Sequence, residues 1–300
     1  MFRSSYYIFF CFLFLVFKIL AISFTQHDLF GDEAQYWLWS KNLDFGYYSK
    51  PPLLSWFVFL FCFLFGDNFF VIKIIPIFFY ILSSYLIYLI AYKLWKNKEL
   101  AFLASVTFFL MPAVSFSSFI LSTDVLLIFF WNMSLFQLLN LLNKARTVNF
   151  VLLGLFLGLA FLSKYAAVYF FLCLAFLFFE KRVRVVISSN IFAVFLFFVV
   201  FLLVVSPNII WNINNGWLTF GHTADNAALD RISFNLFNVV IFILSQAVML
   251  GPVIFIVFFF VIKKNLISEF NNRFLVYFSF PIFFIILIES YLVRANANWA

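Results

Sequence analysis

The sequence predicts an all-α polytopic membrane protein, and its composition and residue pattern support this fold class. Hydrophobic residues make up 66% of the 300 residues, charged residues only 10%, and the mean hydropathy is +1.11. A soluble domain carries about 25% charged residues. Continuous apolar stretches such as 192–205 exclude a transmembrane barrel, whose strands alternate polar and apolar residues. The chain is therefore expected to form a single transmembrane domain of helices, residues 1–300.

The first apolar run, residues 5–24, is expected to be an uncleaved first helix. It exceeds the roughly 7–15 apolar residues of a signal peptide and contains Lys18. A crossing helix needs roughly 20 residues. The two shorter runs 148–163 and 166–180 are included because they fit between the basic residues Arg146 and Lys181. On this basis the sequence predicts crossings at 5–24, 69–92, 99–117, 124–142, 148–163, 166–180, 185–205, 235–262 and 274–293.

Basic residues set the expected orientation, because Lys and Arg accumulate on the cytoplasmic side of a membrane protein. Clusters separated by even numbers of crossings place the N-terminus inside and the C-terminus outside. They are Arg3; Lys93, Lys96 and Lys98; Lys144 and Arg146; Lys181, Arg182 and Arg184; and Lys263, Lys264 and Arg273. Most acidic residues then fall outside. The net charge of +7 is thus explained by topology, and no nucleic-acid partner is expected.

One apolar run, 51–65, does not fit this count of crossings. Its 15 residues would make a helix about 22 Å long, shorter than the roughly 30 Å hydrocarbon core. We therefore expect it to be re-entrant or to lie along the outer interface. Residues 25–68 then form one large external loop, and 206–234 form a second.

The first external loop contains the densest group of polar and aromatic residues. The adjacent acids Asp32 and Glu33 could accept a proton or bind a divalent metal, while Lys50 could face an anion such as phosphate. The loop also holds three aromatic candidates for stacking on a substrate, Tyr36, Trp37 and Tyr48. The alternative is structural, since Trp and Tyr form interfacial belts and Asp caps helices. The spacing alone does not choose between these interpretations.

Further candidates lie on the same predicted side. Asp124 opens a helix, where it is either an N-cap or a second functional acid. Lys164 and Arg294 are additional anion contacts. His222 and Asp225 are three residues apart and are a candidate metal or acceptor contact, although a solvated histidine is the alternative.

Several segments resemble bacterial membrane glycosyltransferases of the protein-mannosyltransferase-like class, also called GT-C or glycosyltransferase family 39. These segments are GDEAQYWLWSKNLDFGYYSKPPL, LSTDVLL, GLAFLSKYAAV, PNIIWNINNGWLTFGHTADNA and ANANWA. The class includes the lipid A aminoarabinose transferases. The resemblance implies a GT-C-like helical bundle in the bacterial inner membrane, with interfacial helices in its first loop and a periplasmic active site.

The resemblance also implies an activity. The donor would be a sugar on a polyprenyl phosphate, and inverting transfer of the hexose or pentose would reach a lipid, glycan or protein acceptor. Asp32 matches the acid that orients or deprotonates the acceptor, with Glu33 beside it, and Asp124 matches a second acid. Lys50 matches the lysine that holds the lipid phosphate. A divalent metal cation is the candidate cofactor.

Two alternatives remain at this stage. A transporter or flippase would use the same acids and lysine along a pathway, but it would carry ionisable residues deep in several helices, where this sequence has Lys18 and Lys73. The second alternative is an inactive remnant. Members of the class usually continue through several more helices, so we expect this chain to be truncated at its C-terminus.

Overall fold

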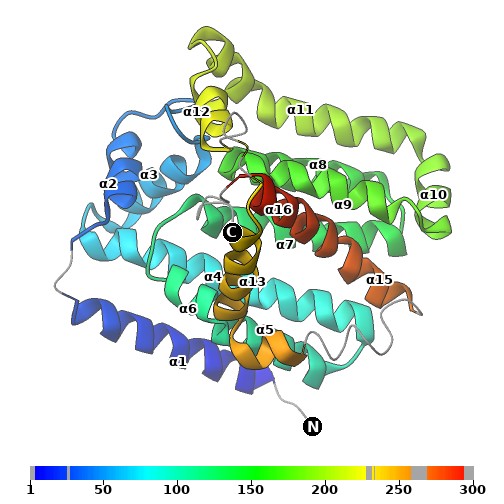
Figure 1. Cartoon of the computed structure of the whole chain (residues 1–300), viewed down its shortest axis with the longest axis horizontal. Helices are drawn as coiled ribbons and strands as arrows, with labels where there is room; N and C mark the ends of the chain where they lie inside the picture. The colour runs from blue at the N-terminus through cyan, green and yellow to red at the C-terminus, as the bar shows by residue number, and fades with distance from the viewer. Residues whose placement is uncertain (1–3, 26–27, 228–231, 233, 258–268, 294–300) are drawn as a thin grey trace.

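The computed structural model describes all residues except 1–3, 26–27, 228–231, 233, 258–268 and 294–300. The described part of the chain contains helices and no strand (Figure 1). Among the described residues, five helical segments are long and apolar enough to cross a membrane: 6–23 within α1 (Ser4–Ser23), α4 (Phe69–Trp95), α7 (Thr123–Asn143), α11 (Ile191–Asn214) and 270–292. This confirms the predicted all-α polytopic membrane fold.

The centre of the bundle is built from α4, α7, α8 (Thr147–Ser163) and α11. Two glycines of α8, four residues apart, allow α11 to approach closely. A Cβ atom at Gly154 would lie 2.5 Å from the Phe197 carbonyl oxygen, and one at Gly158 would lie 2.8 Å from the Val204 side chain. Small residues at this spacing let helix backbones pack together in a membrane, where contact area replaces the hydrophobic driving force.

The helices that carry the candidate acids and those that carry a basic cluster lie toward different ends of the bundle, which we call its acidic end and its basic end (Figure 1). At the acidic end lie α2 (Gly31–Ser40), α3 (Leu53–Phe65) and α12 (Leu218–Ala227), together with the start of α7. At the basic end lie α10 (Lys181–Ser188) and α15 (Phe270–Tyr277). The 13-residue α3 coincides with the run that is too short to cross. At about 1.5 Å per residue it reaches roughly 20 Å.

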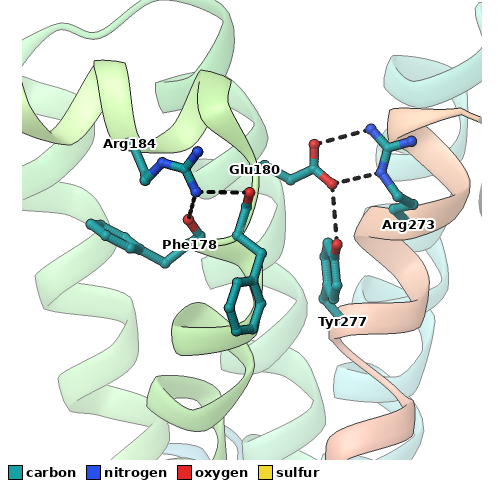
Figure 2. A network of polar contacts seen from close by, with 6 residues as sticks. Phe178, Glu180, Arg184, Arg273 and Tyr277 are labelled. Carbon is teal, nitrogen blue, oxygen red and sulfur yellow. Dashed lines mark hydrogen bonds and ion pairs between the residues drawn. The ribbon is translucent and has the colours of Figure 1, made fainter.

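The basic end is held together by Glu180, at the start of α10 (Figure 2). Its carboxylate accepts hydrogen bonds from Arg273 Nε at 2.6 Å, from a second guanidinium nitrogen at 3.0 Å and from the Tyr277 hydroxyl at 3.1 Å. Arg184 donates instead to the Phe178 and Phe179 carbonyl oxygens. Two nitrogens of the Arg273 guanidinium thus bind the two oxygens of one carboxylate, which fixes α15 against the start of α10.

Several predicted crossings are interrupted in the structure. The run 99–117 divides into α5 (Lys98–Leu110) and α6 (Pro112–Ser117), because Pro112 has no N–H for a helical bond and starts a new helix. The run 166–180 is a 3₁₀ turn, Tyr165–Val168, followed by α9 (Tyr169–Leu177). The C-terminal run begins earlier than predicted and breaks between α15 and α16 (Phe280–Leu292), just before Pro281.

The second predicted loop, 206–234, is largely helical in its described part. Helix α11 continues through Pro207 to Asn214, and α12 follows after a short turn. Buried partners for Asn208 and Asn212 explain how these polar residues remain inside a helix. Helix α13 (Leu236–Leu250) stops at Gly251, whose φ of +88° favours glycine. The last part of the predicted 235–262 crossing, from residue 258 on, lies outside the described residues.

Candidate active site

Glu33 connects the two segments that carry the acids. It lies in the first turn of α2 and is fully buried. Its Oε2 atom accepts from Lys73 Nζ at 2.5 Å and from the Phe30 N–H at 2.9 Å, while Oε1 accepts from the Leu121 N–H at 2.7 Å. Since Leu121 stands three residues before Asp124, Glu33 fixes the start of α2 relative to the start of α7.

The segment before Asp124 is held by three further side chains. Lys73 Nζ also donates to the Phe119 carbonyl oxygen at 3.3 Å. The Tyr80 and Ser117 hydroxyls lie 2.6 Å apart, and Lys18 Nζ donates to the Ser115 carbonyl oxygen at 2.5 Å. Lys18 and Lys73 are therefore buried lysines with specific partners, and they hold the loop that leads into α7.

Asp124 forms an ion pair with Lys164, which follows the end of α8. Lys164 Nζ lies 2.7 Å from Asp124 Oδ1, and the Asp124 side chain is 44% exposed. Ser122 occupies the N-cap position of α7 but makes no side-chain capping bond. In the structure Asp124 faces a cation rather than the helix backbone.

The loop that carries Lys50 is anchored to α11 and α12 by buried polar contacts. Thr219 Oγ1 donates to the Tyr47 carbonyl oxygen at 2.6 Å, and Asn208 Nδ2 donates to the Phe45 carbonyl oxygen at 2.7 Å. Gly46 allows the Trp211 ring to pack on this loop, because a Cβ atom there would lie 2.4 Å from Trp211 Cε3. The loop is thus fixed by contacts from more than 150 residues away in the sequence.

Lys50 and Lys164 share one electrostatic environment with Asp32 and Asp124. Burial lowers the pKa of Lys50, and the positive charge of Lys164 lowers it further, whereas Asp32 and Asp124 oppose these effects. The pKa of Tyr36 is raised by burial and then by the charges of the same two acids. Lys50 and Lys164 also line one recess of about 30 Å³ with Tyr165, Thr223 and Asn226. The ion pair and the shared recess thus bring Asp124, Lys164 and Lys50 together, and Asp32 is close enough to act on the charge of Lys50.

An apolar groove of about 280 Å³ begins at this site, and we call it the α7–α16 groove. Its polar lining residues are Asn132 and the pair of Asp124 and Lys164, which we call its mouth. Its walls come from α7, α16 and the segment around α9, and include Leu127, Trp131, Ala166, Tyr169, Ile282 and Ile286. The groove thus joins an ion pair to an apolar channel between helices.

Asp32 and Glu33 are placed very differently. The Asp32 carboxylate is exposed, and within the described residues no hydrogen bond or ion pair engages it. The Glu33 carboxylate has both oxygens occupied by buried donors. Successive residues of a helix point about 100° apart, so one acid faces the site and the other faces the core.

The three candidate aromatics also differ. Tyr36 is 2% exposed and belongs to the core. Trp37 donates its Nε1–H to Asp67 at 2.6 Å, and its ring lies 4.7 Å from Lys41 Nζ, so its contacts are with the loop before α4. Tyr48 is exposed, and its ring centroid lies 5.2 Å from that of His222.

His222 bonds to Asn226 rather than to Asp225. The His222 Nδ1 and Asn226 Nδ2 atoms are 3.0 Å apart, one helical turn along α12, while Asp225 is exposed. In the part of the chain that the structure describes, no three His, Cys, Asp or Glu side chains are grouped to hold a metal ion. Arg294 lies outside the described residues.

Sequence reasoning missed the network that supports Lys50. The Tyr165 hydroxyl donates to Asn208 Oδ1 at 2.9 Å and accepts from Asn212 Nδ2 at 3.2 Å, and Asn212 Oδ1 accepts from the Thr219 N–H at 3.2 Å. The available signal was the spacing of Asn208 and Asn212. Residues four apart share a helix face, which suggests a common set of partners.

Comparison with known proteins places this arrangement in a family. Residues 49–211, more than half of the chain, match the family described as dolichyl-phosphate-mannose-protein mannosyltransferase. These residues include Lys50, Asp124 and Lys164. No solved structure matches the chain significantly.

Curated relatives extend the similarity. The lipid A galacturonosyltransferase RgtD of Rhizobium johnstonii is 31% identical over 291 residues, which are 96% of this chain and 60% of that protein. The undecaprenyl phosphate-alpha-4-amino-4-deoxy-L-arabinose arabinosyl transferase of Wigglesworthia glossinidia brevipalpis is 29% identical over 126 residues, which are 41% of this chain and 22% of that protein. An enzyme of the same name from Pseudomonas aeruginosa is 28% identical over 144 residues, 47% of this chain and 26% of its own length. The chain thus spans three fifths or less of these relatives, and it belongs to the dolichyl-phosphate-mannose-protein mannosyltransferase family of multi-pass membrane proteins.

Proposed function

We propose that the chain is a glycosyltransferase that moves a sugar from a polyprenyl-phosphate donor to a lipid acceptor such as lipid A. The carrying observation is the Asp124–Lys164 ion pair in the lining of the apolar α7–α16 groove, with Lys50 beside Lys164 in an adjoining recess and Asp32 close enough to act on the charge of Lys50. The named activities of the galacturonosyl and aminoarabinosyl relatives support the substrate classes. The site would face the periplasm at the inner membrane, since the acids lie at the end opposite to the basic clusters.

The donor would enter with its lipid chain in the groove and its phosphate at the lysines. The walls of Leu127, Trp131, Ile282 and Ile286 suit an isoprenoid chain. Lys50 and Lys164 supply two positive charges within reach of a phosphate, in a partly buried environment where such charges act strongly. Arg294 stays a proposed additional phosphate contact.

In the reaction, the bond from the sugar anomeric carbon to the phosphate oxygen breaks as a bond to the acceptor oxygen forms. The lysines stabilise the negative charge that develops on the leaving phosphate. Asp32, whose carboxylate is exposed and unengaged, accepts the acceptor proton, an assistance typically worth about 10² to 10⁴-fold. Attack from the face opposite the phosphate inverts the anomeric configuration.

The other predicted residues take supporting roles in this proposal. Glu33 positions Asp32 and Asp124 through Lys73 and Leu121 and does not touch the reacting atoms. Asp124 holds Lys164 at the groove mouth. Of the three aromatics, Tyr48 is exposed beside His222, so Tyr48 is our proposed sugar or acceptor contact.

The transporter interpretation finds no support in the buried lysines. Lys18 is bound by the Ser115 carbonyl oxygen and lies 3.7 Å from the Phe119 ring centroid, and Lys73 is paired with Glu33. These lysines hold protein segments together instead of lining a continuous polar path.

A reconstituted assay tests the proposal. The chain is placed in proteoliposomes with undecaprenyl-phosphate-linked galacturonic acid or aminoarabinose as donor and lipid A as acceptor, and the products are measured by mass spectrometry. We expect sugar-modified lipid A and free undecaprenyl phosphate in equal amounts. Movement of the donor across the bilayer without any modified lipid A would contradict the proposal.

A further inference from the structure

A second cavity lies away from the α7–α16 groove, between α1, α4 and α6. We call it the α1–α6 cavity. Its volume is about 300 Å³, and its walls include Ala21, Ile22, Phe30, Lys73, Phe116 and Ile120. It shares no lining residue with the α7–α16 groove. The proposed function does not use it.

Two segments of the chain that line this cavity lead directly to Asp32 and Asp124. Asp28 and Phe30 line it, and Asp32 follows two residues later. Phe119 and Ile120 line it from the other side, and Asp124 follows four residues after Ile120. The buried Glu33 carboxylate joins these segments through the N–H groups of Phe30 and Leu121. The cavity is therefore tied to the proposed reaction centre.

The chemistry of the cavity suits a hydrocarbon chain. Lys73 is 5% exposed, and its ammonium group is already bound by Glu33 and the Phe119 carbonyl oxygen. Its charge is thus compensated within the wall, and the remaining inner surface comes mainly from Ala, Ile and Phe side chains. Thr25 and Asp28, both exposed, give the cavity a polar rim at the acidic end.

A transfer between two lipid-linked substrates sets a geometric requirement. Each lipid must keep its chains in hydrocarbon while the two head groups meet at one centre, because moving a chain into water costs about 0.8 kcal/mol per methylene. A single groove of about 280 Å³ does not hold both lipids. A second apolar cavity that reaches the same acids from another side meets the requirement.

We propose that the α1–α6 cavity binds an acyl chain of the lipid acceptor. This inference rests on the proposed function and adds the place where the acceptor enters, between α1 and α6. The polar rim then lies at the level of the acceptor head group, and the acceptor hydroxyl approaches Asp32 from the side of Phe30.

The test is a pair of matched substitutions, one for each apolar site. Ala21 lines the α1–α6 cavity and Ala166 lines the α7–α16 groove, and both are half-buried. We expect Ala21→Trp to raise KM for lipid A about tenfold, equivalent to losing roughly two buried methylene groups, without changing KM for the donor. Ala166→Trp should do the reverse.

Phe116→Trp provides a milder second variant, because Phe116 is 69% exposed and a larger ring there should not disturb folding. Lipid A from which the acyl chains have been removed provides the substrate control. With it, the wild-type chain and the two cavity variants should have the same KM. A penalty that persists with the deacylated acceptor, or a higher donor KM for Ala21→Trp, would overturn the inference.

Binding of lipid A in the absence of donor separates this inference from the proposed function. If the wild-type chain binds lipid A, Ala21→Trp weakens that binding, and no sugar is transferred, the proposed function fails and the cavity assignment stands. If transfer occurs and Ala21→Trp leaves both lipid A binding and its KM unchanged, the cavity holds another lipid and the inference fails.

Discussion

The Lys164 ammonium lies 2.7 Å from the Asp124 carboxylate, at the mouth of an apolar groove between α7 and α16. The pair holds a cation where a lipid phosphate would meet the protein. Lys50 lines an adjoining recess with Lys164, which places a second cation beside the pair.

The two lysines should give donor binding a characteristic pH dependence. The pKa of Lys50 is lowered by burial and then by Lys164, so Lys50 loses its charge at a lower pH than the usual value of about 10.4. Donor affinity should therefore fall as the pH rises through this lowered pKa. Lys164→Met removes the like charge, so the fall should move to higher pH, although affinity is weaker throughout. Donor KM measured from pH 7 to 10 checks this, and a fall at the same or lower pH would argue against the shared site.

Gly46 should be sensitive to the smallest side chain. A Cβ atom there would overlap the Trp211 ring at 2.4 Å, so Gly46→Ala must displace the ring or the Lys50 loop. We expect donor KM to rise about tenfold, since small misplacements of binding groups are costly. Adding Trp211→Ala should restore part of the loss. If Gly46→Ala binds donor like the wild-type chain, the loop is not held by this contact.

The Glu33–Lys73 pair should be essential to folding stability. Breaking a fully buried ion pair leaves an uncompensated charge and typically costs about 3–5 kcal/mol. Glu33→Gln and Lys73→Met should each lower the unfolding temperature in detergent, and the double variant should lose less than the sum. Additive losses would show that the two side chains do not depend on one another.

Glu180 should contribute folding stability that depends on pH and is lost in acid. Its hydrogen bonds from Arg273 lower its pKa, so the pair stabilises the fold above the ordinary glutamate value of about 4.3. This stability is lost as the pH falls through the lowered folded pKa. Glu180→Gln should therefore unfold at a lower temperature than the wild-type chain at pH 7, with the difference closing as the pH falls through the lowered pKa of Glu180. Arg184→Gln is the matched control, because Arg184 donates to backbone carbonyls; a difference for Glu180→Gln that does not depend on pH would contradict the assignment.

The sequence predicted the helical membrane fold and placed Asp32, Asp124, Lys50 and Lys164 on one side of the membrane, because apolar runs, charge placement and family motifs carry this information locally. It did not separate the roles of Asp32 and Glu33. That distinction depends on Lys73, which is 40 residues away and in another helix.

Long-range contacts explain the other differences. Residues 206–214 read as a polar loop, yet they continue α11 because Tyr165 and the backbone at Phe45 satisfy Asn208, and Tyr165 and Thr219 satisfy Asn212. Tyr36 and Trp37 look like substrate contacts in the sequence, but their packing against the core and Asp67 is decided by tertiary structure.

The most direct test of the central claim is the rate of sugar transfer to lipid A by Asp32→Asn in proteoliposomes. The matched control is Asp67→Asn, which removes an acid at the same end of the bundle that pairs with Lys41. We predict that Asp32→Asn lowers kcat by about 10² to 10⁴-fold with unchanged donor KM and normal folding. Asp67→Asn should stay near the wild-type rate. Near-normal transfer by Asp32→Asn would contradict the assignment of this acid as the base.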